Sequence, residues 1–205
     1  MNLRCLYPGR GNRGFSMVEL IVVLAIIAIV AALVTLPTNL WRSENVTTTG
    51  NLVMGDLAYA RELAIANNQP VEAWFLRPTG GTSITGLQVY LIDQTGSASA
   101  YGTVRHLPLS LGIDSGSYLS PILVTGNQKT FGGSQVQPTI PGYGTSYQAW
   151  YVRFMPDGST TLQNTQQWYL TLHDVSLGDQ MTKLPANYAM ISIDPSAGTV
   201  NLYRP

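Results

Sequence analysis

Residues 13–19 read Arg13-Gly14-Phe15-Ser16-Met17-Val18-Glu19, and the apolar run LIVVLAIIAIVAALVTL follows at once as Leu20–Leu36. Thr35 is the only polar side chain in that run. A helix over residues 15–36 would be about 33 Å long at ~1.5 Å per residue, enough to cross a hydrocarbon core of about 30 Å. The sequence therefore predicts a membrane-spanning helix over residues 15–36.

One carboxylate, that of Glu19, lies inside this apolar segment. A charge within a membrane helix costs roughly 2.5–3.5 kcal/mol on insertion scales, so an intramembrane carboxylate is by default a functional hypothesis. The alternative is a plain membrane anchor with an acid near one end, whose side chain reaches the headgroups. The residues just upstream favour a functional role for Glu19.

The leader, residues 1–14, carries Arg4, Arg10 and Arg13 and no acid. In a secretory signal the apolar region precedes a small-residue cleavage site. Here the order is reversed, because the apolar run follows Gly14. Cleavage after Gly14 would leave the apolar helix on the mature protein. The positive-inside rule places the leader in the cytoplasm and everything after Leu36 on the far side of the membrane.

This arrangement resembles the type IV prepilin signature: a basic leader, Gly at the cut, Phe as the new first residue, and Glu four residues after it. The resemblance implies that a prepilin peptidase cuts between Gly14 and Phe15 and methylates the new amino group of Phe15. It also implies that Glu19 pairs with the new amine, of its own or of a neighbouring subunit. Pilins commonly carry a proline near the end of the membrane segment, and Pro37, one residue later than usual, implies a helix kink.

After the apolar run, the sequence predicts a continued helix within residues 37–70 and a β-rich head over residues 71–205. Residues 46–50, Val-Thr-Thr-Thr-Gly, are poor helix formers, so we expect the helix to thin, bend or break there. Helical spacing then returns, and it predicts an apolar stripe that packs on a sheet, formed by Val53, Leu57, Ala60 and Ala64.

Alternating apolar residues and turn signals predict strands over Val71–Leu76, Leu87–Ile92, Trp150–Met155, Trp168–Leu172, Tyr188–Ile193 and Thr199–Tyr203. The last two are expected to form a hairpin across Pro195–Gly198. Residues 94–103 and 132–148 are rich in Gly, Ser, Pro and Tyr, which predicts long surface loops.

The resemblance extends to the head. Leu57-Ala58-Tyr59-Ala60-Arg61 and residues 152–158, Val-Arg-Phe-Met-Pro-Asp-Gly, are similar to minor pseudopilins of the GspH and FimT type. That resemblance implies an α+β, pilin-like fold, in which a long N-terminal helix leans on an antiparallel head of two β-sheets. Residues 68–72, 168–173 and 193–205 are also similar to the Verru_Chthon cassette protein D family, which implies no established biochemical activity.

Composition narrows the function further. Loss of the leader removes three of the 11 basic residues and none of the 11 acidic residues, so the mature chain has a formal charge of −3. That charge does not suit a nucleic-acid binder. The single cysteine, Cys5, lies in the leader, so the mature head has no disulfide. His106 and His173 lie far apart and no Cys or His cluster has metal-ligand spacing. We expect Asp157 to cap turn amides, and we predict no metal, no cofactor and no catalytic residues.

The sequence therefore predicts a structural protein rather than an enzyme: a minor subunit of a type IV pilus-like or type II secretion-like filament. It would cross the inner membrane once, with its head in the periplasm or on an extracellular filament. The expected partners are prepilin peptidase, other pilin or pseudopilin subunits and the inner membrane. The alternative is a membrane-anchored module that binds an extracellular ligand, which the Gly/Tyr-rich residues 143–150 suggest. The sequence is compatible with a pilus or a secretion system, and with a position at the tip or in the shaft of the filament.

Overall fold

The computed structural model describes residues 16–34, 39–123, 125–131 and 137–205. The chain forms two compact units, Met1–Leu40 and Trp41–Pro205. The first unit contains helix α1 (Met17–Val34), and the second contains nearly all of helix α2 (Asn39–Asn67) and every strand. The second unit is called the head below.

Helix α1 is an apolar helix whose side chains from residues 17 to 31 are all exposed. Its large hydrophobic residues range from 45% exposed at Val23 to 80% exposed at Met17. An exposed apolar surface of this extent indicates contact with a membrane or with partner proteins. Among the helices in the described part of the chain, none combines the length and the apolarity that a membrane crossing takes.

Helix α2 runs without interruption through residues 46–50, so the predicted break in that segment is wrong. Tertiary contacts override the weak helix propensity of these residues. Val46 and Thr49 are buried against the head, and the Thr47 hydroxyl accepts a hydrogen bond from Arg204 Nε at 3.0 Å. Gly50 lets the helix approach the strands closely, because a Cβ there would lie 3.0 Å from Leu202 Cδ1.

The helix ends where the sequence predicts. Its last residue is Asn67, and Asn68 takes a left-handed conformation with φ of 51°. Asn tolerates this conformation better than most residues, and Pro70 then prevents further helix. The chain passes directly into the first strand.

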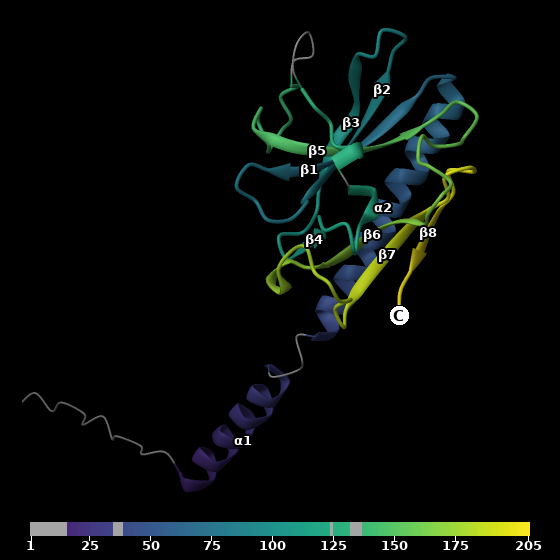
Figure 1. Cartoon of the computed structure of the whole chain (residues 1–205). Helices are drawn as coiled ribbons and strands as arrows, with labels where there is room; N and C mark the ends of the chain where they lie inside the picture. The colour runs from purple at the N-terminus through teal and green to yellow at the C-terminus, as the bar shows by residue number, and fades with distance from the viewer. Residues whose placement is uncertain (1–15, 35–38, 124, 132–136) are drawn as a thin grey trace, which may run out of the picture. The chain divides into compact units, whose positions relative to one another are not determined.

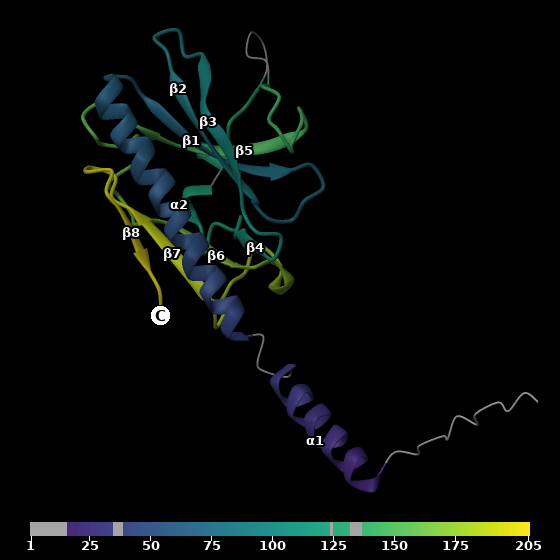
Figure 2. The same cartoon turned by 180° about the vertical axis from the view of Figure 1, so that it is seen from behind.

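The head contains two four-stranded antiparallel sheets, as predicted, and α2 runs alongside both (Figures 1 and 2). The first sheet has the order β3-β2-β1-β5, from strands β1 (Val71–Pro78), β2 (Gly86–Ile92), β3 (Ala98–His106) and β5 (Tyr147–Phe154). The second has the order β4-β6-β7-β8, from β4 (Leu111–Ile113), β6 (Trp168–Asp174), β7 (Tyr188–Ile193) and β8 (Val200–Tyr203). Three short 3-10 helices complete the described structure: η1 (Pro121–Leu123), η2 (Thr125–Asn127) and η3 (Val175–Leu177).

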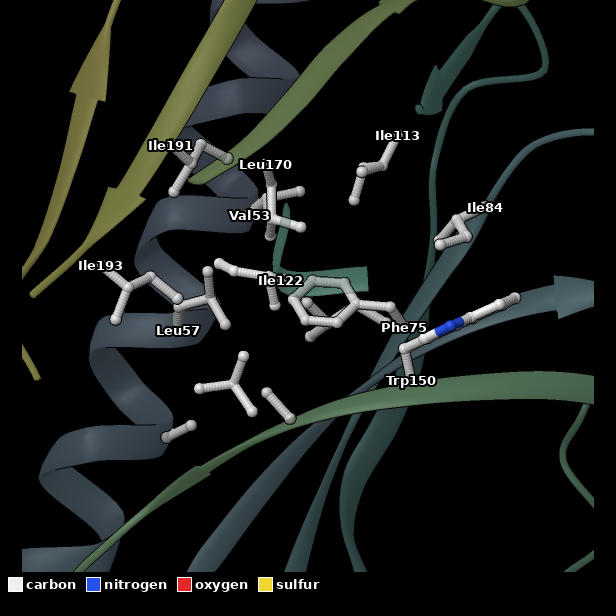
Figure 3. Packing of buried hydrophobic residues seen from close by; sticks show 14 of the residues in the cluster. Val53, Leu57, Phe75, Ile84, Ile113, Ile122, Trp150, Leu170, Ile191 and Ile193 are labelled. Atoms are coloured by element: carbon white, nitrogen blue, oxygen red, sulfur yellow. The ribbon is translucent and has the colours of Figure 1, made fainter. Parts of the chain in front are cut away.

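The main core lies between α2 and the two sheets (Figure 3). The predicted stripe on α2 is confirmed, since Val53, Leu57, Ala60 and Ala64 are all 0% exposed. Figure 3 shows Val53 and Leu57 pointing toward side chains of both sheets, including Phe75 of β1 and Ile191 of β7. One helix face therefore serves both sheets.

A second apolar cluster covers the other face of the first sheet. It contains Trp74, Leu76, Tyr90, Ile92, Ile140, Tyr143, Tyr147 and Ala149. Tyr143, Tyr147 and Trp150 are each less than a tenth exposed, so all three aromatic side chains of residues 143–150 pack inside the head. These buried rings therefore do not offer the contact surface that residues 143–150 suggested for the ligand-binding alternative.

Strand β3 occupies most of the predicted loop at residues 94–103, which is a second correction. This edge strand is largely exposed, so it lacks the apolar alternation that identifies buried strands. Its pairing with β2 shifts register between Leu87 and Val89, and Gly102 has φ of 70°. The Gln88 side chain supports this irregularity by donating to the carbonyl oxygen of Tyr101 at 3.0 Å.

Two glycines of α2 test the close approach of helix and sheet. Gly50→Leu should destabilise the head by about 1–3 kcal/mol through overpacking against β7 and β8. Gly55→Leu is the matched control, because a Cβ at Gly55 meets nothing within 4 Å. It should be neutral or gain up to about 0.8 kcal/mol from helix propensity. Thermal unfolding of the detergent-solubilised protein measures both. Equal melting temperatures for the two variants would contradict this packing.

Candidate functional site

The residues predicted for processing and assembly fall only partly within the described structure. Gly14, Phe15 and Pro37 lie outside the described residues. Glu19 lies in the first turn of α1, where a carboxylate is stabilised by the positive end of the helix dipole, and it is exposed. The Ser16 hydroxyl accepts the backbone N–H of Val18 at 3.3 Å, so the helix begins immediately after the predicted cut.

In the head, the carboxylate of Glu72 on β1 is fully buried, at 0% exposed. Its Oε2 accepts from Lys129 Nζ at 2.8 Å and from the indole N–H of Trp74 at 2.6 Å. Its Oε1 accepts from Arg153 of β5 at 3.0 Å from Nε and 2.5 Å from Nη2. Both carboxylate oxygens of Glu72 thus accept hydrogen bonds from cationic side chains, which offsets the cost of burying a charge.

Aromatic rings complete the environment of these two cations. The Lys129 ammonium lies 5.2 Å from the Trp74 ring centre and 5.1 Å from that of Tyr151. Arg153 lies 5.8 Å from the Tyr151 ring centre. The Glu72 cluster, formed by Glu72, Trp74, Lys129, Tyr151 and Arg153, therefore joins β1 to β5 and to the segment around Lys129.

A second buried ionic contact joins His173 of β6 to Asp114, which follows β4. His173 is 1% exposed and Asp114 is 0% exposed. His173 Nε2 lies 3.2 Å from Asp114 Oδ2, and its Nδ1 lies 2.9 Å from the carbonyl oxygen of Asp174. Both ring nitrogens therefore face an acceptor oxygen. Only a protonated imidazole carries a hydrogen on each nitrogen, so only this form can donate to both oxygens.

The pKa values of this pair agree with an ion pair. Burial lowers the pKa of His173, but the contacts with Asp114 and the Asp174 carbonyl outweigh it, so the pKa is raised above its usual 6.5. For Asp114, burial raises the pKa, but hydrogen bonds from His173 and from the backbone N–H groups of Met181 and Gly116 lower it overall. His173 therefore forms a buried ionic contact that joins β6 to the segment after β4.

Other predicted polar residues also have structural contacts. Asp157 accepts the backbone N–H of Ser159 at 2.9 Å, the turn-capping role that the sequence predicts. His106 stacks on Tyr143 with ring centres 5.4 Å apart. Within the described residues, no group of three or more His, Cys, Asp or Glu side chains could hold a metal ion.

Sequence reasoning missed the Glu72 cluster and the role of Asp114. A signal for the first was present, because Glu72 is the only charge in the strand Val71–Leu76 and a buried carboxylate needs a cationic partner. The sequence does not show that Lys129 and Arg153 supply it, since both lie more than 50 residues away. Arg61, noted only as part of a motif, donates from Nε to the carbonyl oxygens of Gly158 and Ala197 at 3.1 and 2.7 Å.

Removal of the Glu72 charge should be costly. Glu72→Gln leaves two cations without their shared anion and should destabilise the head by about 3–5 kcal/mol. Asp56→Asn is the matched control, because its partner Arg105 has a side chain 39% exposed, and such pairs contribute about 0–1 kcal/mol. Urea unfolding measures both, and a Glu72→Gln loss no larger than that of Asp56→Asn would refute the assigned role.

The His173–Asp114 pair predicts a pH dependence. A raised histidine pKa means that the folded state binds its proton more tightly, so this contribution is complete below about pH 6.5 and is lost as the pH rises through the folded-state pKa. The free energy of unfolding should therefore decline as the pH rises above about 6.5. His173→Gln should remove this component, whereas His106→Gln should keep it. Urea titrations across this range check the slope. If the free energy of unfolding of His173→Gln depended on pH as in the wild type, the pH dependence would come from another group.

Comparison with known proteins identifies the N-terminal segment. Residues 9–35 match the prokaryotic N-terminal methylation motif. No curated protein matches the sequence. The finer resemblance to the Verru_Chthon cassette protein D family stays a prediction.

Among solved structures, the minor pseudopilin EpsH from the type 2 secretion system of Vibrio cholerae is 11% identical, with a TM-score of 0.44 over 78% of this chain and 98% of that chain. The type IV minor pilin FimU of Pseudomonas aeruginosa is 11% identical, with a TM-score of 0.44 over 79% of this chain and 89% of that chain. The chain therefore carries a prokaryotic N-terminal methylation motif at residues 9–35 and an α+β head of two antiparallel sheets.

Proposed function

We propose that this protein is a minor pilin or pseudopilin, a structural subunit of a type IV pilus-like or type II secretion-like filament. One observation carries the proposal: the methylation motif over residues 9–35 ends in the apolar helix α1, whose described side chains are exposed. A soluble protein does not leave such a helix uncovered. Lipid, and then neighbouring subunits, would cover it.

Processing would follow from the order of the segments. Prepilin peptidase cuts between Gly14 and Phe15 and methylates the amine of Phe15. The apolar residues 15–36 then hold the protein as a single pass in the inner membrane, with the head on the periplasmic side or on the extracellular filament. Pro37 would kink the helix after this segment.

Glu19 would be the assembly residue. A carboxylate in apolar surroundings needs an opposite charge, and the cut creates a cationic amine only four residues away. Glu19 is exposed on α1, so its carboxylate is accessible to the amine of a neighbouring subunit as well as to its own. The inter-subunit pair would set the register between adjacent subunits.

The head would act through its surface rather than through chemistry. Its most buried ionisable groups, Glu72, Asp114 and His173, are paired within the fold. The alternative function, a membrane-anchored module that binds an extracellular ligand, loses the aromatic segment that suggested it, because Tyr143 and Tyr147 are buried.

One experiment tests processing and assembly together. Wild-type protein, Gly14→Leu and Glu19→Val are produced in cells that contain prepilin peptidase and a major pilin, and each is followed by intact mass and filament fractionation. The wild type should begin at methylated Phe15 and appear with filaments. Gly14→Leu should keep its leader. Glu19→Val should be cut, because it inserts at least as well, but should be depleted from filaments.

The alternatives give different outcomes. A mature species that begins at Met1 would refute processing. Normal incorporation of Glu19→Val into filaments would refute the pairing role. It would favour the plain membrane anchor, in which the Glu19 side chain only reaches the headgroups. Wild-type protein that is cut but stays in the inner membrane would favour the anchored module.

A further inference from the structure

A cleft lies in the head between the segment that follows β4 and the loop that follows η3. Its volume is about 430 Å³, within the range of about 300–1,000 Å³ that small-molecule sites occupy. One wall is formed by Ser115–Tyr118 with Leu123, and the other by Gln180–Thr182. None of the functions discussed above uses this cleft.

The lining is neutral and polar. Among the described residues, no charged side chain lines the cleft, and four of the lining residues are Ser115, Ser117, Gln180 and Thr182. Within the described residues, the side chains of Ser117, Gln180 and Thr182 make no hydrogen bond. Their donors and acceptors are therefore available to a ligand, and the lack of a cation makes a carboxylate or phosphate ligand a poor fit.

One lining residue is an exposed aromatic. The side chain of Tyr118 is 63% exposed, although its backbone is held by a hydrogen bond from the Tyr169 hydroxyl to its carbonyl oxygen at 2.9 Å. A tyrosine ring on a fixed backbone offers a flat apolar surface with a polar tip and loses little conformational entropy on binding. Such a surface suits the C–H face of a sugar ring.

Hydrogen bonds join the two walls of the cleft. Met181 donates its backbone N–H to Asp114 Oδ2 at 3.1 Å, the same carboxylate that contacts His173. Ser115 donates its backbone N–H to Asp179 Oδ1 at 2.7 Å. Hydrogen bonds to Asp114 and Asp179 thus hold the backbone of both walls in place, and Asp114 also belongs to the buried pair with His173. This fixed backbone pre-organises the cleft for a ligand.

Backbone geometry also concentrates at this cleft. Gln180 has φ of 56°, a left-handed conformation that non-glycine residues adopt at a cost and that clusters at ligand sites. Gly116 faces it so closely that a Cβ would lie 2.8 Å from Gln180 Cα. The close approach fixes where the Gln180 amide enters the cleft.

We propose that this cleft binds a neutral saccharide of one or two sugar rings, with Tyr118 as the stacking surface and Ser117, Gln180 and Thr182 as hydrogen-bond partners. Neutral hydroxyl-rich ligands match a lining that has free hydroxyl and amide groups, one exposed aromatic ring and no charge. The proposal does not depend on filament membership, since the cleft lies wholly within the head.

The test uses the full chain in a zwitterionic detergent without a sugar headgroup. The probes are maltose, cellobiose and N,N′-diacetylchitobiose, measured by saturation-transfer NMR and titration calorimetry. At least one disaccharide should bind, and inorganic phosphate should not. Tyr118→Ala should weaken that binding at least tenfold. Tyr203→Ala is the matched control, because this tyrosine on β8 is 57% exposed and should leave the affinity unchanged.

Gln180→Gly provides a second variant that keeps the fold. Glycine relieves the positive φ while it removes the amide, so the melting temperature should hold or rise and the sugar affinity should fall. The proposal is overturned if no probe sugar binds, if phosphate binds as well as the sugars, or if Tyr118→Ala and Gln180→Gly bind like the wild type. An equal loss in Tyr203→Ala would likewise overturn it.

Discussion

The head depends on one packing constraint: a single face of α2 has to fit two sheets at once. Val46, Val53, Leu57 and Ala60 on this face are all 0% exposed, and their partners come from both sheets. Among the described residues, the other helix in this core is the three-residue η1, which contributes Ile122 and Leu123. Loss of α2 would therefore expose apolar surface on both sheets. At Gly50 the helix lies close to β7 and β8, because a Cβ there would lie 3.1 Å from Ala189 Cβ and 3.0 Å from Leu202 Cδ1.

Buried ion pairs add specificity to this apolar frame. Glu72 ties β1 to Arg153 of β5, directly opposite in the strand register, and Asp114 ties the end of β4 to His173 of β6. Desolvation offsets much of the attraction in such pairs, so their net stabilisation is small, while the loss of one partner is costly. They disfavour shifted registers, since a slip of one residue would leave a charge buried and unpaired. Each sheet thus has one ionic contact that defines its register.

Much of this architecture could be predicted from sequence because it depends on local patterns. The spacing of Val53, Leu57, Ala60 and Ala64 predicts the buried face of α2, and alternation predicts the inner strands. The predictions that failed share one cause, because contacts between residues distant in sequence determined the structure there. Residues 46–50 are helical because the sheets hold them, and β3 is a strand although it is an exposed edge. The partners of Glu72 and Asp114 are distant in sequence, so local patterns contain no sign of them. In contrast, the proposed N-terminal site is a contiguous motif, so its candidate residues Gly14, Phe15 and Glu19 come from the sequence signature, and their roles stay predictions.

Under the proposed function, the N-terminal motif would direct processing and assembly, and the head supplies a stable surface whose two sheets share α2. The most direct test of this account is native-state hydrogen exchange of the head. If α2 is continuous and serves both sheets, amides at residues 46–64 should exchange in the same cooperative unit as those of β1 and β7, with the same opening free energy. Exchange of residues 46–50 at a much lower free energy than the two sheets would contradict the account, because the sheets would then be stable without that part of the helix.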